Sequence, residues 1–322
     1  MTRASEGAIL LIRLSAMGDI VHTLPAAATL KKSFPDRKLL WLVAPRWMPL
    51  LAGNPYINEV IPFERTGLVA LRSASRRIRQ VAAEWAFDFQ GLVYSALLGR
   101  AARAKVLFGF DKSVAREPLA SLFYTRRVAI AGPHRIERNV QLAAAAGAQE
   151  LIYDAWIPEG SPEGELPPGP FVLTNPFAGW PGKEWPLVSF ELLAQRLRSE
   201  GLQLVANVPA NRAREVAKLK NVHVHISTLA GLIDATRRAT AVIGLDSGPL
   251  HLAAALRKPG VGLFGPTDPL RTGPFGGSMT VLRADETETT YKRHARIHAS
   301  MKAITVDAVA SALLRSLSRV AV

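Results

Sequence analysis

The sequence has no cysteine among its 322 residues. This absence excludes disulfide bonds, thiolate zinc sites and cysteine nucleophiles. The sequence also has no apolar run approaching the roughly 18 residues of a spanning helix. Residues 8–12 are apolar but too short for the core of a signal peptide. With 48% hydrophobic and 20% charged residues, the composition predicts an ordinary globular protein.

Motifs for tightly bound phosphates and metals are missing as well. The sequence contains no G-x-x-x-x-G-K-[ST] phosphate loop and no H-E-x-x-H zinc motif. We therefore expect no metal site in the protein and no required cofactor. Mg²⁺ could assist a reaction on a phosphorylated substrate, but nothing in the sequence supports it.

Acidic residues are scarce relative to basic ones. The chain has 40 Lys and Arg against 26 Asp and Glu, a net charge of +14. Residues 62–127 hold 12 basic and 5 acidic side chains, whereas residues 128–165 hold 2 and 6. This charge favours nucleotides, phosphosugars, nucleic acid or an acidic membrane surface as partners, and a solvated surface explains it equally well. Since no nucleic-acid recognition motif is present, we expect no nucleic-acid partner.

Short apolar stretches alternate with helical patterns along the whole chain, which predicts parallel sheets covered by helices. Expected helices include residues 19–32, 68–83, 211–219 and 307–320. Proline, glycine and acids fill residues 161–170, which we expect to be a linker. The α/β chain is thus expected to form two doubly wound domains, residues 1–160 and 171–322, facing across a cleft.

Polar residues follow several predicted strands, at the sheet edge where ligands of such folds bind. Asp19 stands after the first strand and could act as a helix cap or take a proton from a sugar hydroxyl. Lys183 follows the strand that ends at Thr174 and could bind a phosphate or remain a solvated loop residue.

A second polar turn joins the predicted strand 241–245 to a helix. The backbone amides of Ser247 and Gly248 would face an anion at the start of this helix. Asp246 could hold a sugar hydroxyl or only orient the turn, and His251 lies one turn further on. The Gly-Pro turn at residues 265–269 follows the next strand and could reach the same cleft or only shape the loop.

Together these segments resemble a known family. The stretch 15–25, SAMGDIVHTLP, the turn 246–251, DSGPLH, and the turn 265–269, GPTDP, are similar to family 9 glycosyltransferases, the ADP-heptose:lipopolysaccharide heptosyltransferases. Residues 115–124, AREPLASLFY, look most like the heptosyltransferase I branch, which adds the first heptose to Kdo of the inner core. The resemblance spans nearly the whole chain, and the combination of motifs is more specific than any one of them.

The resemblance implies a GT-B fold with two Rossmann-like domains and an inverting, single-displacement transfer of heptose. It implies an N-terminal domain that binds the acceptor and a C-terminal domain that binds the nucleotide sugar. The C-terminal helix could pack back on the N-terminal domain. Asp19 would be the general base, and Lys183 would stabilise the departing ADP. The expected donor-binding residues are Thr174, Lys183, Asn211, Ser227, Asp246, Ser247, Gly248 and His251, and the expected acceptor-binding residues are Gly18, Arg116 and Arg138.

The implied partners are ADP-heptose and Kdo-lipid A, whose carboxylates and phosphates suit the basic segment. The protein is then expected to be a cytoplasmic monomer that touches the anionic inner face of the inner membrane. Arg65, Arg72, Arg76, Arg77 and Arg79 could meet acceptor or membrane, or line a solvated helix face. The alternatives are heptosyltransferase II, another family 9 transferase with a different acceptor, and a sugar-nucleotide epimerase of similar architecture.

Overall fold

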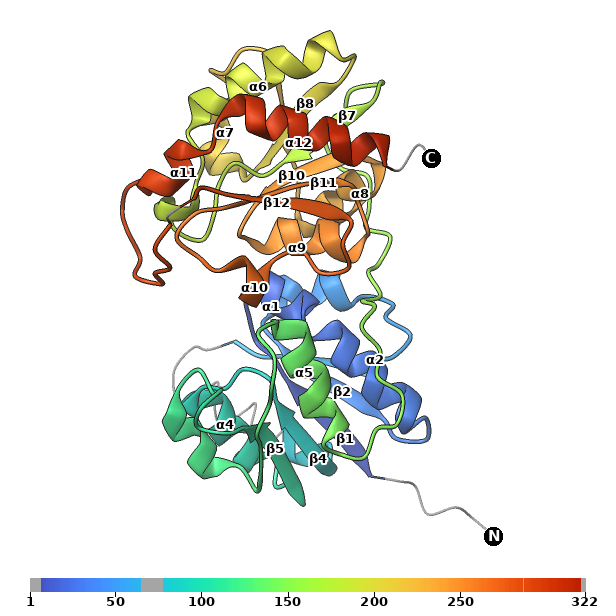
Figure 1. Ribbon diagram of the computed structural model, residues 1–322. Helices are drawn as coiled ribbons and strands as arrows, with labels where there is room; N and C mark the ends of the chain where they lie inside the picture. Colours follow the sequence, from blue (N-terminus) through green and yellow to red (C-terminus); the bar gives the residue numbers. More distant parts are fainter. Residues whose placement is uncertain (1–6, 65–77, 286, 320–322) are drawn as a thin grey trace. The chain divides into compact units, whose positions relative to one another are not determined.

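The computed structural model describes residues 7–64, 78–285 and 287–319. The chain divides into two compact units, Met1–Pro158 (unit 1) and Glu159–Val322 (unit 2). Each unit contains a six-stranded sheet in which all neighbouring strands are parallel (Figure 1). This confirms the predicted α/β class and the doubly wound parallel sheets.

The sheet of unit 1 has the strand order β3-β2-β1-β4-β5-β6. Its strands are β1 (Ala8–Ile12), β2 (Leu39–Val43), β3 (Glu59–Pro62), β4 (Ala83–Asp88), β5 (Val106–Phe110) and β6 (Arg126–Val128). The central strands are nearly continuous apolar runs because helices cover both faces. The strand order reverses at β1: the chain continues from β1 to β2 and β3 on one side, and β4, β5 and β6 lie on the other side.

Helices pack on both faces of this sheet. They are α1 (Met17–Val21), α2 (Leu24–Ser33), η1 (Pro45–Leu51), α4 (Val93–Ala101), η2 (Pro118–Phe123) and α5 (Arg135–Ala144). Leu10 and Ile12 of β1 share a core with Leu98 of α4, whereas α2 and α5 pack against each other. Since side chains alternate along a strand, β1 contributes to both layers.

Unit 2 has the strand order β12-β11-β10-β7-β8-β9. Its strands are β7 (Phe171–Thr174), β8 (Gln203–Val208), β9 (Val222–Ile226), β10 (Ala241–Leu245), β11 (Gly260–Phe264) and β12 (Met279–Arg283). Its helices are η3 (Pro181–Lys183), α6 (Leu187–Ser199), η4 (Ala210–Arg212), α7 (Ala213–Val216), α8 (Leu229–Arg238), α9 (Gly248–Ala255), α10 (Pro269–Thr272), α11 (Ala299–Ala303) and α12 (Val306–Ser318). Helices α6 and α12 share a core with β10 and β11, so the C-terminal helix packs on its own unit.

Several expected helices have different bounds in the structure. The helix expected over residues 19–32 is two helices, α1 and α2, because Pro25 stands in the first turn of α2 and cannot lie inside a continuous helix. The helix expected over residues 211–219 shrinks to η4 and the four-residue α7. The helix expected over residues 68–83 lies mostly outside the described residues, and it does not reach residue 83, because β4 begins there.

Candidate active site

Asp19 lies at the carboxyl edge of the unit 1 sheet, just after the central strand β1. A loop over residues 13–16 leads from β1 into α1, and Asp19 is the third residue of this short helix. Its Oδ2 accepts the backbone N–H of Ala16 at 3.3 Å. Ala16 is the N-cap residue, so Asp19 caps the helix from its third position and not as the N-cap itself. Its side chain nevertheless remains 20% exposed, which leaves it accessible to a substrate.

Two arginines hold the Asp19 carboxylate from opposite sides. Arg13 Nη2 lies 2.6 Å from Oδ2, and Arg135 Nη1, from α5, lies 2.8 Å from Oδ1. Burial alone would raise the pKa of Asp19, but the charges of Arg13 and Arg135 outweigh it and lower the pKa to about 2. Burial in turn lowers the pKa of Arg13 to about 10, against the pull of Asp19. At neutral pH Asp19 and Arg13 are therefore both charged.

Asp88, at the end of β4, stabilises the same edge of the sheet through hydrogen bonds. Its carboxylate is completely buried and accepts hydrogen bonds from the Tyr124 and Ser95 hydroxyls, each at 2.8 Å. Burial raises the pKa of Asp88 despite these bonds, and burial together with Asp88 raises the pKa of Tyr124. Asp88 also accepts the backbone N–H of Gln90 at 2.9 Å, which fixes the turn after β4.

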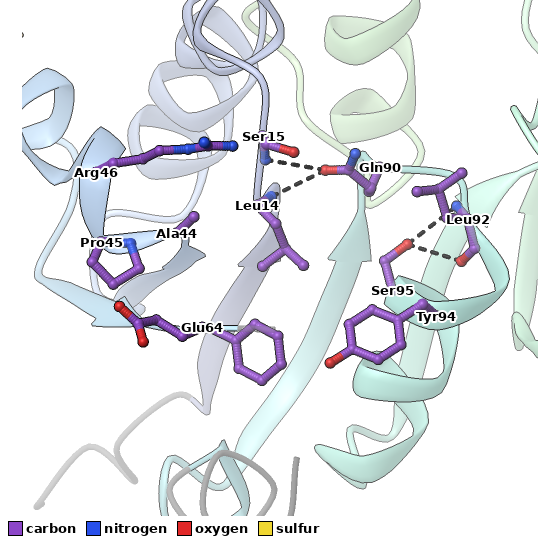
Figure 2. Close-up of a pocket in the computed structure, with 11 residues that line it drawn as sticks. Leu14, Ser15, Ala44, Pro45, Arg46, Glu64, Gln90, Leu92, Tyr94 and Ser95 are labelled. Carbon is purple, nitrogen blue, oxygen red and sulfur yellow. Dashed lines mark hydrogen bonds between the residues drawn. The ribbon is translucent and has the colours of Figure 1, made fainter. Parts of the chain in front are cut away.

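Gln90 transmits this support to the Asp19 loop. Its Oε1 accepts the backbone N–H groups of Leu14 at 3.1 Å and Ser15 at 3.4 Å (Figure 2). The Arg13 guanidinium donates to the carbonyl of Phe89, next to Gln90. The ends of β1 and β4 are thus tied together, and this network positions the residues around Asp19.

A cavity of about 560 Å³ opens beside this loop, entirely within unit 1. The described residues that line it are Leu14, Ser15, Ala44, Pro45, Arg46, Phe63, Glu64, Gln90, Leu92, Tyr94 and Ser95. The Tyr94 ring lies 6.0 Å from that of Phe63, and Figure 2 shows Leu14 near Tyr94, with Arg46 and Glu64 across the pocket. The lining thus combines two aromatic rings with one basic and one acidic side chain.

The other expected acceptor residues also lie in unit 1. Gly18 is buried inside α1, directly before Asp19. Arg116 is exposed, and its charge helps to lower the pKa of Asp19. Arg138 donates from Nε to the Gly132 carbonyl at 2.9 Å. The arginines that contact Asp19 are instead Arg13 and Arg135. Sequence reasoning missed Arg135 because no local pattern links residues 116 positions apart.

Unit 2 carries a second charged cluster around Asp246, which follows its central strand β10. Asp246 Oδ2 lies 2.6 Å from Lys183 Nζ and accepts the Thr267 hydroxyl at 2.7 Å. Oδ1 accepts the Thr272 hydroxyl at 3.3 Å and lies 3.8 Å from His251 Nε2. Burial would raise the pKa of Asp246, but Lys183 and then His251 outweigh it and lower the pKa. The structure thus brings Lys183, Asp246 and His251 together as expected.

Three buried hydroxyls in unit 2 have no partner among the described residues, and two of them lie at the carboxyl ends of strands, whereas the third, Ser278 Oγ, precedes β12. The first two are Ser247 Oγ, at the residue that precedes α9, and Thr174 Oγ1, at the end of β7. A buried polar atom without a hydrogen bond is costly, so a ligand is a reasonable partner for each. The N-terminal amides of α9 begin at Gly248 and provide further donors for an anion.

The remaining expected donor residues lie near the ends of β8 and β9. Ser227 and Asn207 exchange hydrogen bonds of 3.0 and 3.2 Å between their side chains. Asn211 is exposed in η4. Its neighbour Arg212 stacks on Phe177, with Cζ 3.4 Å from the ring centroid, and pairs with Glu184. Sequence reasoning did not single out Arg212 or Phe177.

Two signals of a cofactor site, a metal-ligand cluster and the dinucleotide motif, lack support in the part of the chain that the structure describes. No group of three or more His, Asp or Glu side chains there could hold a metal ion. Residues 260–265 match the spacing G-x-G-x-x-G, but residues 260–264 form strand β11, whereas the dinucleotide motif requires a turn between strand and helix. No described helix is both long and apolar enough to cross a membrane.

Comparison with known proteins identifies the family. The sequence model of glycosyltransferase family 9 (heptosyltransferase) matches residues 71–301. Lipopolysaccharide heptosyltransferase 1 of Pseudomonas aeruginosa is 33% identical over 297 residues, which cover 86% of this chain and 84% of that protein. Lipopolysaccharide heptosyltransferase 1 of Escherichia coli K12 is 30% identical over 305 residues, covering 86% of this chain and 93% of the relative.

Solved structures agree with this result. The E. coli heptosyltransferase WaaC with ADP is 27% identical, with a TM-score of 0.76 over 96% of this chain and 99% of the other. The E. coli ADP-heptose lps heptosyltransferase II has the same fold, with a TM-score of 0.80 and 24% identity over 98% of this chain and 100% of the other. The expected GT-B fold and glycosyltransferase activity are confirmed, which removes the epimerase alternative. The chain belongs to glycosyltransferase family 9, the heptosyltransferases.

Proposed function

We propose that this enzyme transfers heptose from ADP-heptose to Kdo of Kdo-lipid A, the first heptose addition of the lipopolysaccharide inner core. The similarity to heptosyltransferase 1 proteins from two organisms supports this step over later ones. A related solved structure holds ADP-2-deoxy-2-fluoro heptose, which supports ADP-heptose as the donor. The observation that carries the proposal is the accessible Asp19 carboxylate, held by arginines beside a pocket of sugar size.

The proposed reaction is a single displacement with inversion. Asp19 takes the proton of the acceptor hydroxyl as that oxygen forms its bond to the anomeric carbon of heptose. The bond from this carbon to the ADP oxygen breaks on the opposite face, and ADP leaves with the electron pair. No covalent intermediate with the protein is needed, in keeping with one carboxylate as the base.

Unit 2 would stabilise the departing diphosphate. Lys183 supplies a positive charge, and the amides of Ser247 and Gly248 supply hydrogen-bond donors at the start of α9. Lys183 now rests on Asp246, a contact of 2.6 Å that keeps its ammonium at the strand edge before ADP-heptose binds. The unpartnered hydroxyls of Ser247 and Thr174 are candidates for donor contacts.

Unit 1 would bind the anionic acceptor. Arg116 and Arg138 are candidates for its carboxylates and phosphates, and the pocket beside Ser15 could take a sugar ring. A lipid-linked acceptor also requires the enzyme to reach the inner face of the cytoplasmic membrane as a peripheral protein. The basic segment that could contribute, residues 65–79, lies largely outside the described residues.

The test measures ADP release from ADP-heptose in the presence of Kdo-lipid A. Wild type should release ADP, whereas Asp19→Asn should lose most of the transfer while ADP still stabilises it in a thermal shift assay. A wild-type enzyme that is active only on an acceptor already carrying one heptose would assign the second transfer instead. Wild-type turnover by Asp19→Asn would remove Asp19 as the base.

A further inference from the structure

The two arginines that hold Asp19 are anchored very differently. The Arg13 side chain is 2% exposed, donates to the Phe89 carbonyl and is attracted by buried Asp88. The Arg135 side chain is 23% exposed and extends from the first residue of α5. Among the residues that the structure describes, Asp19 is the one group that contacts the Arg135 guanidinium. Arg13 is therefore a fixed partner of Asp19, whereas Arg135 is free to exchange.

This arrangement poses a problem for a general base. Oδ2 is taken by Arg13 and the Ala16 amide, and Oδ1 is taken by Arg135. With both arginines in place the pKa of Asp19 is about 2, whereas an efficient base at neutral pH has a higher pKa. Proton transfer from a sugar hydroxyl thus requires an oxygen of Asp19 to become available and more basic.

We propose that Arg135 is an exchangeable clamp, which holds Asp19 Oδ1 in the free enzyme and moves to the carboxylate of the acceptor sugar when the acceptor binds. This inference rests on the proposed function, since it needs an acidic acceptor. A planar guanidinium pairs with either carboxylate in the same way, so the exchange keeps its hydrogen bonds. It couples recognition of an acidic sugar to release of the base, and Arg135 acts as a positioning residue.

The other charged groups around Asp19 do not replace this role. They are Arg13 directly after β1, Arg116 before η2 and Asp88, which attracts Arg13; the imidazoles of His22, after α1, and His134, before α5, contact each other edge-on. Arg13 stays in place throughout. Loss of one arginine contact raises the pKa of an aspartate by about 1–3 units, and the incoming carboxylate acts in the same direction.

The experiment compares pH profiles of wild type, Arg135→Gln and Arg135→Lys with Kdo-lipid A as acceptor. The profile of kcat/KM reports the free enzyme, and that of kcat reports the bound complex. Arg135→Gln should move the acidic limb of kcat/KM upward by about 1–3 units and leave the acidic limb of kcat in place. Its acceptor KM should rise about 10- to 100-fold, and Arg135→Lys should recover part of both changes.

Arg37→Gln is the matched control. Arg37 Nη1 pairs with Glu84 at 2.8 Å, the same distance as in the Arg135 pair, and Glu84 lies at the opposite, amino edge of the same sheet. Loss of this pair should leave both acidic limbs unchanged. The clamp would be overturned if the acidic limb of kcat/KM lies at the same pH in wild type and Arg135→Gln. It would also be overturned if Arg37→Gln moves this limb as far as Arg135→Gln does.

A second measurement separates the clamp from the proposed function. An acceptor whose Kdo carboxyl is converted to an amide should lose activity with wild type but little more with Arg135→Gln. If the loss from the amide acceptor and the loss from Arg135→Gln multiply when the two changes are combined, Arg135 does not bind that carboxylate. If wild type transfers no heptose at all, the proposed function fails on its own. The clamp is then tested by carbon NMR of the Asp19 carboxyl, whose signal is assigned by its absence in Asp19→Asn. The pKa of this carboxyl must rise when free Kdo is added, and an unchanged pKa would overturn the clamp.

Discussion

Replacement of Asp19 by Asn should weaken unit 1 as well as abolish transfer. The substitution keeps the size of the side chain but removes the charge between Arg13 and Arg135. The pKa of Asp19 falls from 3.8 to about 2 on folding, and at 1.36 kcal/mol per unit this corresponds to roughly 2 kcal/mol. A buried arginine that loses its partner outright costs about 3–5 kcal/mol. Because Asp88 remains near Arg13, we expect a loss of about 2–4 kcal/mol at pH 7.

The pH dependence of this loss has a definite sign. The folded pKa lies below the unfolded one, so the stabilisation is complete above about pH 4 and disappears as the pH falls through about 2. The free energy of unfolding of unit 1 should therefore differ between Asp19→Asn and wild type by the same amount at pH 5 and pH 7, and this difference should shrink below pH 4.

Hydrogen exchange read by peptide is the assay, because two units need not unfold together. Peptides that cover β1 and β4 should lose protection in Asp19→Asn, whereas peptides that cover β7 and β10 provide an internal control from unit 2. A change in unit 1 below about 0.5 kcal/mol at pH 7, the usual size of a surface effect, would refute the reasoning. So would a difference that grows toward low pH.

Two further substitutions test the charged clusters. Lys183→Ala should reduce kcat/KM for ADP-heptose about 100- to 1,000-fold, since it removes the charge proposed to stabilise the departing diphosphate; steady-state kinetics with varied donor check this, and unchanged donor kinetics would take Lys183 out of the site. Tyr124→Phe removes the 2.8 Å hydrogen bond to buried Asp88 and should destabilise unit 1 by about 1–3 kcal/mol. Hydrogen exchange of peptides that cover β4 measures this destabilisation, and an unaltered exchange rate would show that the hydrogen bond from Tyr124 does not stabilise buried Asp88.

The positions of Asp19 and Asp246 could be predicted because each follows a fully apolar central strand. Continuous apolar runs predicted β1, β10 and β11, and polar residues after such strands lie at the ligand-binding edge. Local patterns of this kind depend on a few neighbouring residues. They are therefore visible in one sequence.

The partners of these residues could not be predicted in the same way. Arg135 reaches Asp19 from 116 residues away, and Tyr124 reaches Asp88 from 36 residues away. No local pattern specifies which of two arginines on one helix, Arg135 or Arg138, points at the site. Strand β5 was missed for a related reason. Its Gly109 weakens the strand pattern, yet glycine is needed there because a Cβ would overlap the Tyr124 ring.

The surroundings of the two carboxylates indicate why Asp19, rather than Asp246, is proposed as the base. Both follow a central strand, and neighbouring cations lower the pKa of both. Asp246 is 7% exposed, and Lys183 and two threonine hydroxyls bind its oxygens, so it holds the Lys183 ammonium in place. Asp19 is 20% exposed, and Arg135, one of its two arginines, is 23% exposed. A base must yield an oxygen to the substrate, and the Asp19 carboxylate is the more exposed of the two, with Oδ1 held by Arg135 alone.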